Sequence, residues 1–195
     1  SIVVVHAPAE AAAAREIARL LSGSPLCAPL AAPLSESYAM RVTNRYYTAD
    51  LAIALAADTA AAADSAAATT CVAPPPAALL ALAQECGALI LLYDLADPSS
   101  FERLKSKWSG QFADGAPEIL LVVGTGRDGA ADNNEAAAAA RWEWCFDAGA
   151  ELVDVDFAAD GAAALEAGAA MREGRRPPAD NGEAEGLSRV LEALQ

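Results

Sequence analysis

The segment that follows the first apolar run, Ile2–Val5, stands where many α/β proteins hold a phosphate. The motif for that chemistry is G-x-x-x-x-G-K-[ST]: glycines let backbone N–H groups wrap the phosphates, the lysine neutralises them and the hydroxyl binds Mg²⁺. Here the glycine positions hold His6 and Ala11, the lysine position Ala12 and the hydroxyl position Ala13. Pro8 removes one N–H donor, and Glu10 adds a negative charge where a triphosphate would lie. We therefore predict that this loop binds no nucleotide.

Two further segments correspond in part to nucleotide-binding motifs. Asp58-Thr59-Ala60-Ala61 keeps the aspartate of an Asp-x-x-Gly motif, but Ala61 replaces the glycine whose N–H contacts the γ-phosphate. Thr125-Gly126-Arg127-Asp128 keeps the aspartate of the guanine-reading Asn-Lys-x-Asp motif, with Thr125 and Gly126 in place of the residues that fix and cover the base. Two interpretations stay open. The chain is a divergent nucleotide-binding protein that uses Asp58 and Asp128, or the match at Asp58 is accidental and the segment with Asp128 is simply a Gly-rich turn.

Composition narrows the classes of partner. The chain carries a formal net charge of −14 and has a pI near 4.3, so it offers no basic stripe to nucleic acid or to an anionic membrane surface, and we expect a protein partner. One histidine and four cysteines without CxxC spacing predict no metal site, no cofactor and no Ser–His–Asp triad. No segment reaches the ~18 apolar residues of a membrane span and no signal peptide precedes the first strand, so we expect a cytosolic protein without membrane insertion.

The run from Gly87 to Trp108 indicates the fold class most clearly. Ala88–Tyr93 is a continuous apolar strand, and the break at Asp97-Pro98 is followed by Ser99 and Ser100, which can cap a helix that begins near Phe101. That helix carries Leu104 and Trp108 on one face. A buried strand, a tight turn and an amphipathic helix form the repeating unit of a parallel α/β sheet.

The rest of the chain continues the alternation of strands and helices. We predict further strands at Ile2–Val5, Tyr38–Val42, Tyr46–Leu55, Glu118–Gly124 and Glu151–Val155, and helices at Ala9–Leu21, Ala77–Cys86, Asn134–Ala148 and Gly186–Gln195. Right-handed crossovers then give a single three-layer α/β domain over residues 1–195, with a mostly parallel sheet and an antiparallel edge strand near Tyr38–Val42. In the helix Asn134–Ala148 we expect Trp142, Cys145 and Phe146 to face the core. Residues 160–185, rich in Gly, Ala, Pro and charge, are expected to form a mobile insert.

Two levels of family resemblance follow from these segments. Gly87–Trp108 resembles the central strand and following helix of Ras- and Rab-type small GTPases. More specifically, three segments resemble, in order and spacing, the N-terminal domain of the alpha- and gamma-adaptin-binding proteins. They are Thr43-Asn44-Arg45-Tyr46-Tyr47-Thr48-Ala49-Asp50, Pro117–Val123, and Ala140–Cys145 leading through Gly149 to Glu151-Leu152-Val153.

This resemblance implies a small-GTPase-like fold with a degenerate nucleotide site, hence a pseudo-GTPase. It implies a cytosolic, non-catalytic chaperone that binds the large (alpha or gamma) subunits of clathrin adaptor complexes during assembly and so supports vesicle trafficking and protein transport. Two alternatives remain: a divergent nucleotide-binding small GTPase, or a Rab-like binding module of another trafficking or ciliary complex. For the protein contact we single out Arg45, Tyr46 and Tyr47, because tyrosine and arginine are favoured interface anchors.

Overall fold

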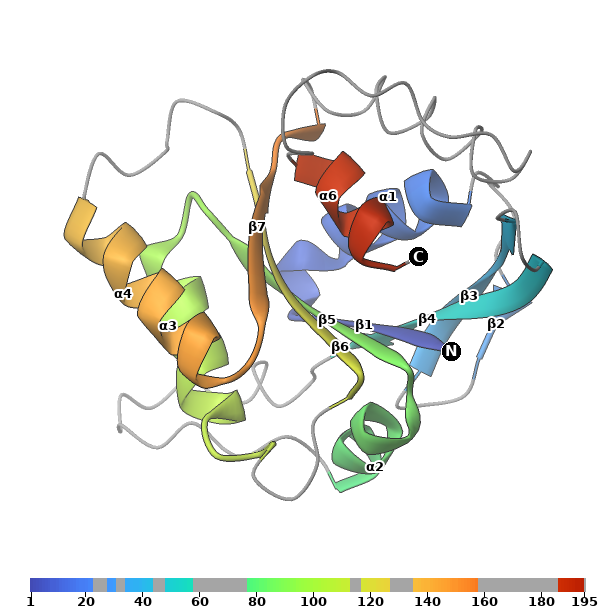
Figure 1. Ribbon diagram of the computed structural model, residues 1–195, viewed down its shortest axis with the longest axis horizontal. Helices are drawn as coiled ribbons and strands as arrows, with labels where there is room; N and C mark the ends of the chain where they lie inside the picture. The colour runs from blue at the N-terminus through green and yellow to red at the C-terminus, as the bar shows by residue number, and fades with distance from the viewer. Residues whose placement is uncertain are drawn as a thin grey trace.

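A computed structural model of the chain describes residues 1–22, 28–30, 34–43, 48–57, 77–112, 117–126, 135–157 and 186–194. Within these residues one sheet has the strand order β2-β3-β4-β1-β5-β6-β7 (Figure 1). The strands are β1 (Ile2–His6), β2 (Ala28–Pro29), β3 (Leu34–Thr43), β4 (Thr48–Ala57), β5 (Ala88–Asp94), β6 (Ile119–Thr125) and β7 (Glu151–Val155). From β4 to β7 all neighbours run parallel, whereas β3 is antiparallel to both β4 and β2. The prediction of an α/β fold with a mostly parallel sheet is confirmed.

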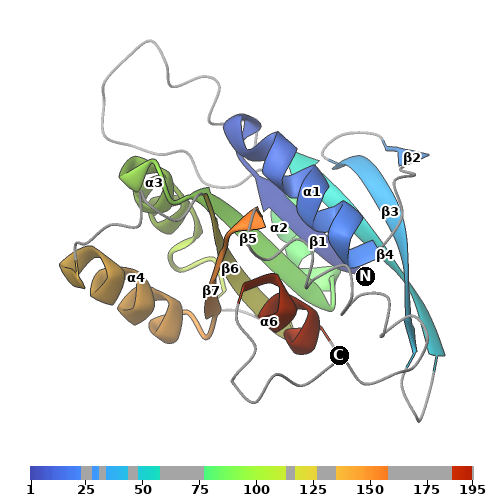
Figure 2. The same ribbon diagram turned by 90° about the horizontal axis from the view of Figure 1, so that it is seen from above.

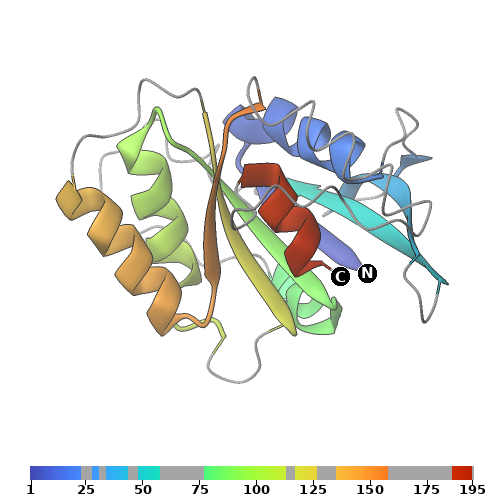
Figure 3. The ribbon, with the colours of Figure 1, turned by 45° about the horizontal axis from the view of Figure 1, so that its top comes forward.

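Helices cover both faces of the sheet, which makes three layers. They are the single-turn 3₁₀ helix η1 (Pro8–Glu10), α1 (Ala11–Ser22), α2 (Ala77–Glu85), α3 (Pro98–Trp108), α4 (Glu135–Asp147) and α6 (Gly186–Ala193). One core cluster joins α1 and α6 to one face, and a second joins α2, α3 and α4 to the other. Figure 3 shows α3 and α4 side by side, and Figure 2 places α4 and the paired strands β3 and β4 at opposite ends of the molecule.

The central strands are apolar along their whole length because both of their faces are covered. Val4 and Ile90 pack towards α1, while Val3 and Leu89, their neighbours along β1 and β5, pack towards α2 and α3. Every residue of β1 is buried, as are Ala88 to Tyr93 of β5 and the last six residues of β6. Continuous apolar runs of this kind are the signature of parallel strands between two helical layers.

Two local predictions need correction. The antiparallel strand near Tyr38–Val42 exists as β3, but the short strand β2 lies outside it and forms the edge of the described sheet. Helix α3 begins at Pro98, not near Phe101, and its cap is Asp97 in place of the two serines. The Asp97 carboxylate accepts a hydrogen bond from the Ser99 backbone N–H at 3.0 Å. Aspartate at the cap followed by proline in the first turn is a favoured start for a helix.

A third correction concerns α4. Cys145 faces the core as expected, but Trp142 and Phe146 are 61% and 68% exposed, and their rings stack on each other with centroids 5.3 Å apart. Helix α4 lies over β7, the last strand on that side of the described sheet, so only one stripe of the helix has a sheet to pack against. The half-buried Trp144 takes the inward position that the sequence pattern assigned to its neighbours.

None of the described helices is both long enough and apolar enough to cross a membrane. The expected insert at residues 160–185 lies outside the described residues, so the structure does not test it.

Candidate functional site

The sheet has a topological switch point between β1 and β5. From β1 the chain passes to β3 and β4 on one side of it, and β5, β6 and β7 follow on the other side. In open α/β sheets, ligands bind in the crevice outside the carboxyl ends of the strands at such a point. The residues after β1, Ala7 to Glu10, and the start of α3 after β5 meet there. This is the position at which the sequence analysis looked for a phosphate loop.

The hydrogen-bond donors at the switch point already have an acceptor within the protein, the Glu10 side chain. Glu10 is only 5% exposed, and its Oε2 accepts a hydrogen bond from the Ala7 backbone N–H at 2.7 Å. The other oxygen, Oε1, accepts from the buried Ser100 hydroxyl at 2.9 Å. Ser100 Oγ in turn accepts from the Asp94 backbone N–H at 3.0 Å. The Glu10 carboxyl group therefore fills the role that a bound anion plays in a phosphate loop, and it ties the loop after β1 to α3.

The other positions that correspond to the phosphate-loop motif carry neither a lysine nor a hydroxyl side chain. His6 ends β1, is 5% exposed, and its Nδ1 lies 2.9 Å from the Ala7 carbonyl oxygen. Ala11, Ala12 and Ala13 form the first turn of α1, and Ala12 of these is exposed. The first turn thus offers methyl groups at the positions where a lysine and a hydroxyl would bind nucleotide and Mg²⁺.

Thr125 and Gly126, at the positions of the base-reading motif, pack against the ends of β5 and β6. The Thr125 hydroxyl is buried and donates to the Tyr93 carbonyl oxygen at 3.2 Å. Gly126 packs closely under the turn after β5: a Cβ built on it would lie only 3.0 Å from the Leu95 Cβ. Thr125 therefore turns inward, and Gly126 allows the turn to approach.

A partly buried hydrogen bond crosses β6 beside these residues. The Tyr93 hydroxyl donates to Asp154 Oδ1 at 3.0 Å, passing over Gly124. Burial, together with the nearby Asp154, raises the pKa of the Tyr93 phenol, and the same two causes raise the pKa of Cys145 to about 11. Both groups stay protonated at neutral pH, which suits a structural role and not that of an activated nucleophile.

Six of the predicted positions lie outside the described residues: Asp58, Ala61 and Asp128 of the nucleotide motifs, and Arg45, Tyr46 and Tyr47 of the expected protein contact. The structure therefore brings together His6, Ala11, Ala12, Ala13, Thr125 and Gly126 along the carboxyl-terminal edge and leaves the others untested. Within the described part of the chain, no group of His, Cys, Asp or Glu side chains is arranged to hold a metal ion.

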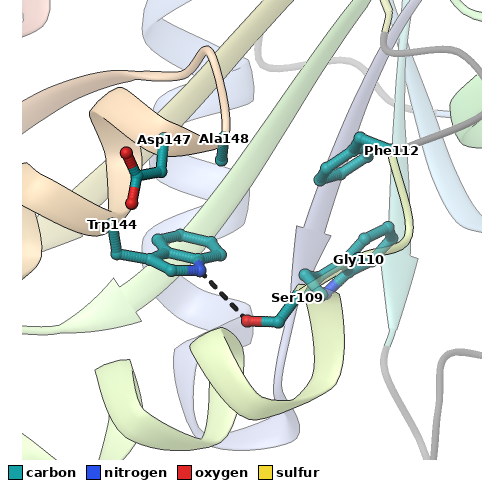
Figure 4. A pocket seen from close by; sticks show the side chains of 7 residues that line it. Ser109, Gly110, Phe112, Trp144, Asp147 and Ala148 are labelled. Carbon is teal, nitrogen blue, oxygen red and sulfur yellow. Dashed lines mark hydrogen bonds between the residues drawn. The ribbon is translucent and has the colours of Figure 1, made fainter.

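Sequence reasoning missed two features. Ser100 was assigned to helix capping, although its hydroxyl is the buried partner of Glu10, 90 residues away in the chain. A hollow of about 320 Å³ between the C-terminal ends of α3 and α4 was also missed; Trp108, Ser109, Phe112, Trp144 and Asp147 are among the residues that line it (Figure 4). Of the residues that line the hollow, the sequence pattern singles out only Trp108, as part of the apolar face of its helix.

Comparison with protein-family models finds no family that matches the chain, and comparison with curated proteins finds no significant match.

Proposed function

We propose that this chain is a pseudo-GTPase: a small-GTPase-like fold of the Ras and Rab type whose nucleotide site no longer works, and which acts as a non-catalytic protein-binding module. The observation that carries the proposal is the Glu10 carboxyl group, which takes the Ala7 N–H and the Ser100 hydroxyl at the switch point. A nucleotide phosphate would have to displace a buried acidic side chain from its two donors, and would meet no lysine in exchange.

The partner is proposed from the sequence resemblance to the adaptin-binding proteins. The module would bind the large alpha or gamma subunits of clathrin adaptor complexes in the cytosol and assist their assembly for vesicle traffic. The net charge of −14 supports a protein partner with a basic surface, because complementary charge speeds and orients association. The proposed contact lies at Arg45, Tyr46 and Tyr47, between β3 and β4 in the chain.

GTP or GDP with Mg²⁺ is expected to leave the melting temperature unchanged. A ligand present at about a thousand times its dissociation constant adds about 4 kcal/mol to the free energy of unfolding. For a domain of this size that would raise Tm by about 8–16 °C. Differential scanning fluorimetry with millimolar nucleotide measures the shift. A clear rise, or nucleotide that co-purifies with the chain, would favour a divergent small GTPase that uses Asp58 and Asp128.

Reversal of charge at Arg45 is expected to weaken binding to a purified large adaptor subunit. Arginine is favoured as an interface anchor because of its packing and its hydrogen bonds, and glutamate, which is shorter and only accepts hydrogen bonds, would lose both. Surface plasmon resonance with Arg45→Glu, and separately Tyr46→Ala and Tyr47→Ala, measures the loss. Arg41→Glu is the matched control, because it makes the same charge change on β3 and breaks only an exposed ion pair with Asp50.

The two possible failures of that experiment have different meanings. If the unaltered chain binds no large adaptor subunit, the adaptor proposal is wrong, and a Rab-like module of another trafficking or ciliary complex takes its place. If it binds, and all variants bind equally well at unchanged Tm, the function stands and the contact lies on another surface.

A further inference from the structure

The hollow between the C-terminal ends of α3 and α4 has walls made of aromatic rings in fixed positions. The rings of Trp108 and Phe112 stack with centroids 5.5 Å apart and an interplanar angle of 11°. Across the hollow, Trp144 packs edge-on against Phe101, with centroids 5.6 Å apart, and its Nε1–H donates to Ser109 Oγ at 3.1 Å. In Figure 4, Trp144 and Asp147 lie on one side of the hollow and Phe112 on the other. The ring positions are therefore set by packing before any ligand arrives.

An acidic group completes the lining. Asp147 is exposed at the end of α4 and forms neither a hydrogen bond nor an ion pair with another described residue. Glu143, one turn earlier on the same helix, is also exposed, and α4 has no basic residue in its last turn, whereas the last turn of α3 carries Lys105 and Lys107. Aromatic faces carry negative electrostatic potential, so rings and carboxylate favour the same kind of ligand, a cation.

We propose that this hollow binds an arginine side chain of a partner protein. A guanidinium group is planar and stacks on aromatic faces, and it can form two parallel hydrogen bonds to one carboxylate. The rings of Trp144 and Phe112 line the hollow, and the exposed Asp147 side chain lies beside Trp144. Its carboxylate is turned away from Phe112 in Figure 4, and no described residue holds it there. The hollow's volume of about 320 Å³ admits the guanidinium with part of the peptide that carries it. The strongly acidic chain favours a basic partner over a second copy of itself.

The hollow and the proposed adaptor contact involve different parts of the chain. Helix α4, which lines the hollow, and the strands β3 and β4 are at opposite ends of the molecule (Figure 2). The inference goes beyond the proposed function, and its test uses no adaptor subunit. If the arginine-binding proposal fails, the adaptor proposal is unaffected, and the reverse also holds.

The test is an NMR titration of the whole chain with Nα-acetyl-arginine amide, followed by the indole N–H signals of the three tryptophans. We expect the Trp144 signal to shift with a millimolar dissociation constant, as befits a single side chain. Trp142 provides an internal control, because it is an exposed aromatic residue on the same helix but does not line the hollow. The neutral isostere Nα-acetyl-citrulline amide is expected to shift neither signal.

Two charge variants complete the experiment. Asp147→Asn is expected to weaken the binding about fivefold, the effect of losing an exposed ion pair. Glu143→Gln, which removes the same charge from the same helix away from the hollow, is expected to leave it within about twofold. The proposal is overturned if Trp142 shifts as much as Trp144, if citrulline binds as well as arginine, or if both variants weaken binding equally. The citrulline comparison needs no variant, so the test holds even if a substitution disturbs α4.

Discussion

Replacement of Glu10 by alanine is expected to lower the free energy of unfolding by about 2–4 kcal/mol, which for a domain of this size lowers Tm by about 4–16 °C. The loss is large because two donors lose their acceptor at once, the Ala7 backbone N–H and the buried Ser100 hydroxyl. Thermal unfolding followed by circular dichroism measures it. Glu102→Ala is the matched control, because Glu102 is exposed on α3, and its loss is expected to change stability by less than about 0.5 kcal/mol.

The partner in this interaction can be identified by a double-mutant cycle. Ser100→Ala removes the donor to Glu10 and the acceptor of the Asp94 N–H, so it is also expected to destabilise the fold. If the two side chains act together, the double variant is less destabilised than the sum of the single variants by about 1 kcal/mol or more. Strict additivity, or a Glu10→Ala protein as stable as Glu102→Ala, would mean that Glu10 does not tie the loop to α3.

Gly124→Ala is expected to lower the free energy of unfolding by about 2–3 kcal/mol, or Tm by about 4–12 °C. A Cβ at this position would lie 2.5 Å from Asp154 Oδ1 and 2.7 Å from the Tyr93 hydroxyl oxygen. Asp154 is exposed and can rotate away, but the Tyr93 ring is fully buried and cannot. Relief of the clash therefore breaks the Tyr93–Asp154 hydrogen bond and strains the core around the ring.

Gly87→Ala is the control for this substitution. Gly87 stands before β5, and the nearest atom to a Cβ on it is the Ser1 carbonyl oxygen at 3.7 Å, an ordinary contact. Alanine there is expected to leave stability unchanged or to raise it slightly, since it restricts the unfolded chain. The double variant Gly124→Ala/Asp154→Ala should regain part of the loss by removing the closest clash. Equal melting temperatures for Gly124→Ala and Gly87→Ala would show that β6 adjusts without cost.

The proposed pseudo-GTPase would differ from an active small GTPase at the switch point, where the Glu10 side chain occupies the hydrogen-bond donors. In the active protein a nucleotide phosphate orders the loops at the carboxyl ends of the strands and so controls which partner binds. Here the Glu10 carboxyl group bonds to the Ala7 N–H in the loop after β1 and to Ser100 of α3, with no nucleotide present. We therefore expect partner binding that does not depend on nucleotide, and the binding assays proposed above can be run with and without GTP to measure this.

The sequence by itself determined the class of fold, and it led to the prediction that the loop after the first strand binds no nucleotide. The apolar runs Ile2–Val5 and Ala88–Tyr93 could be assigned to buried parallel strands, because burial on both faces leaves a local signature in residue type. The alanine at position 12, where the phosphate-loop motif has lysine, could also be interpreted from the sequence alone, since phosphate binding depends on particular residue types at fixed spacing. Such properties belong to short stretches of chain, so no tertiary information was needed.

Only the tertiary structure decided which distant groups meet. Glu10 and Ser100 are 90 residues apart, and Tyr93 and Asp154 are 61 apart, so no local pattern links either pair. The need for glycine at 124 exists only because that hydrogen bond crosses the strand there. The exposure of Trp142 and Phe146 likewise follows from the position of α4 over the last strand of the described sheet. A helical pattern tells which residues share a face of the helix; whether that face is covered depends on where the sheet ends, which the packing of the whole chain decides.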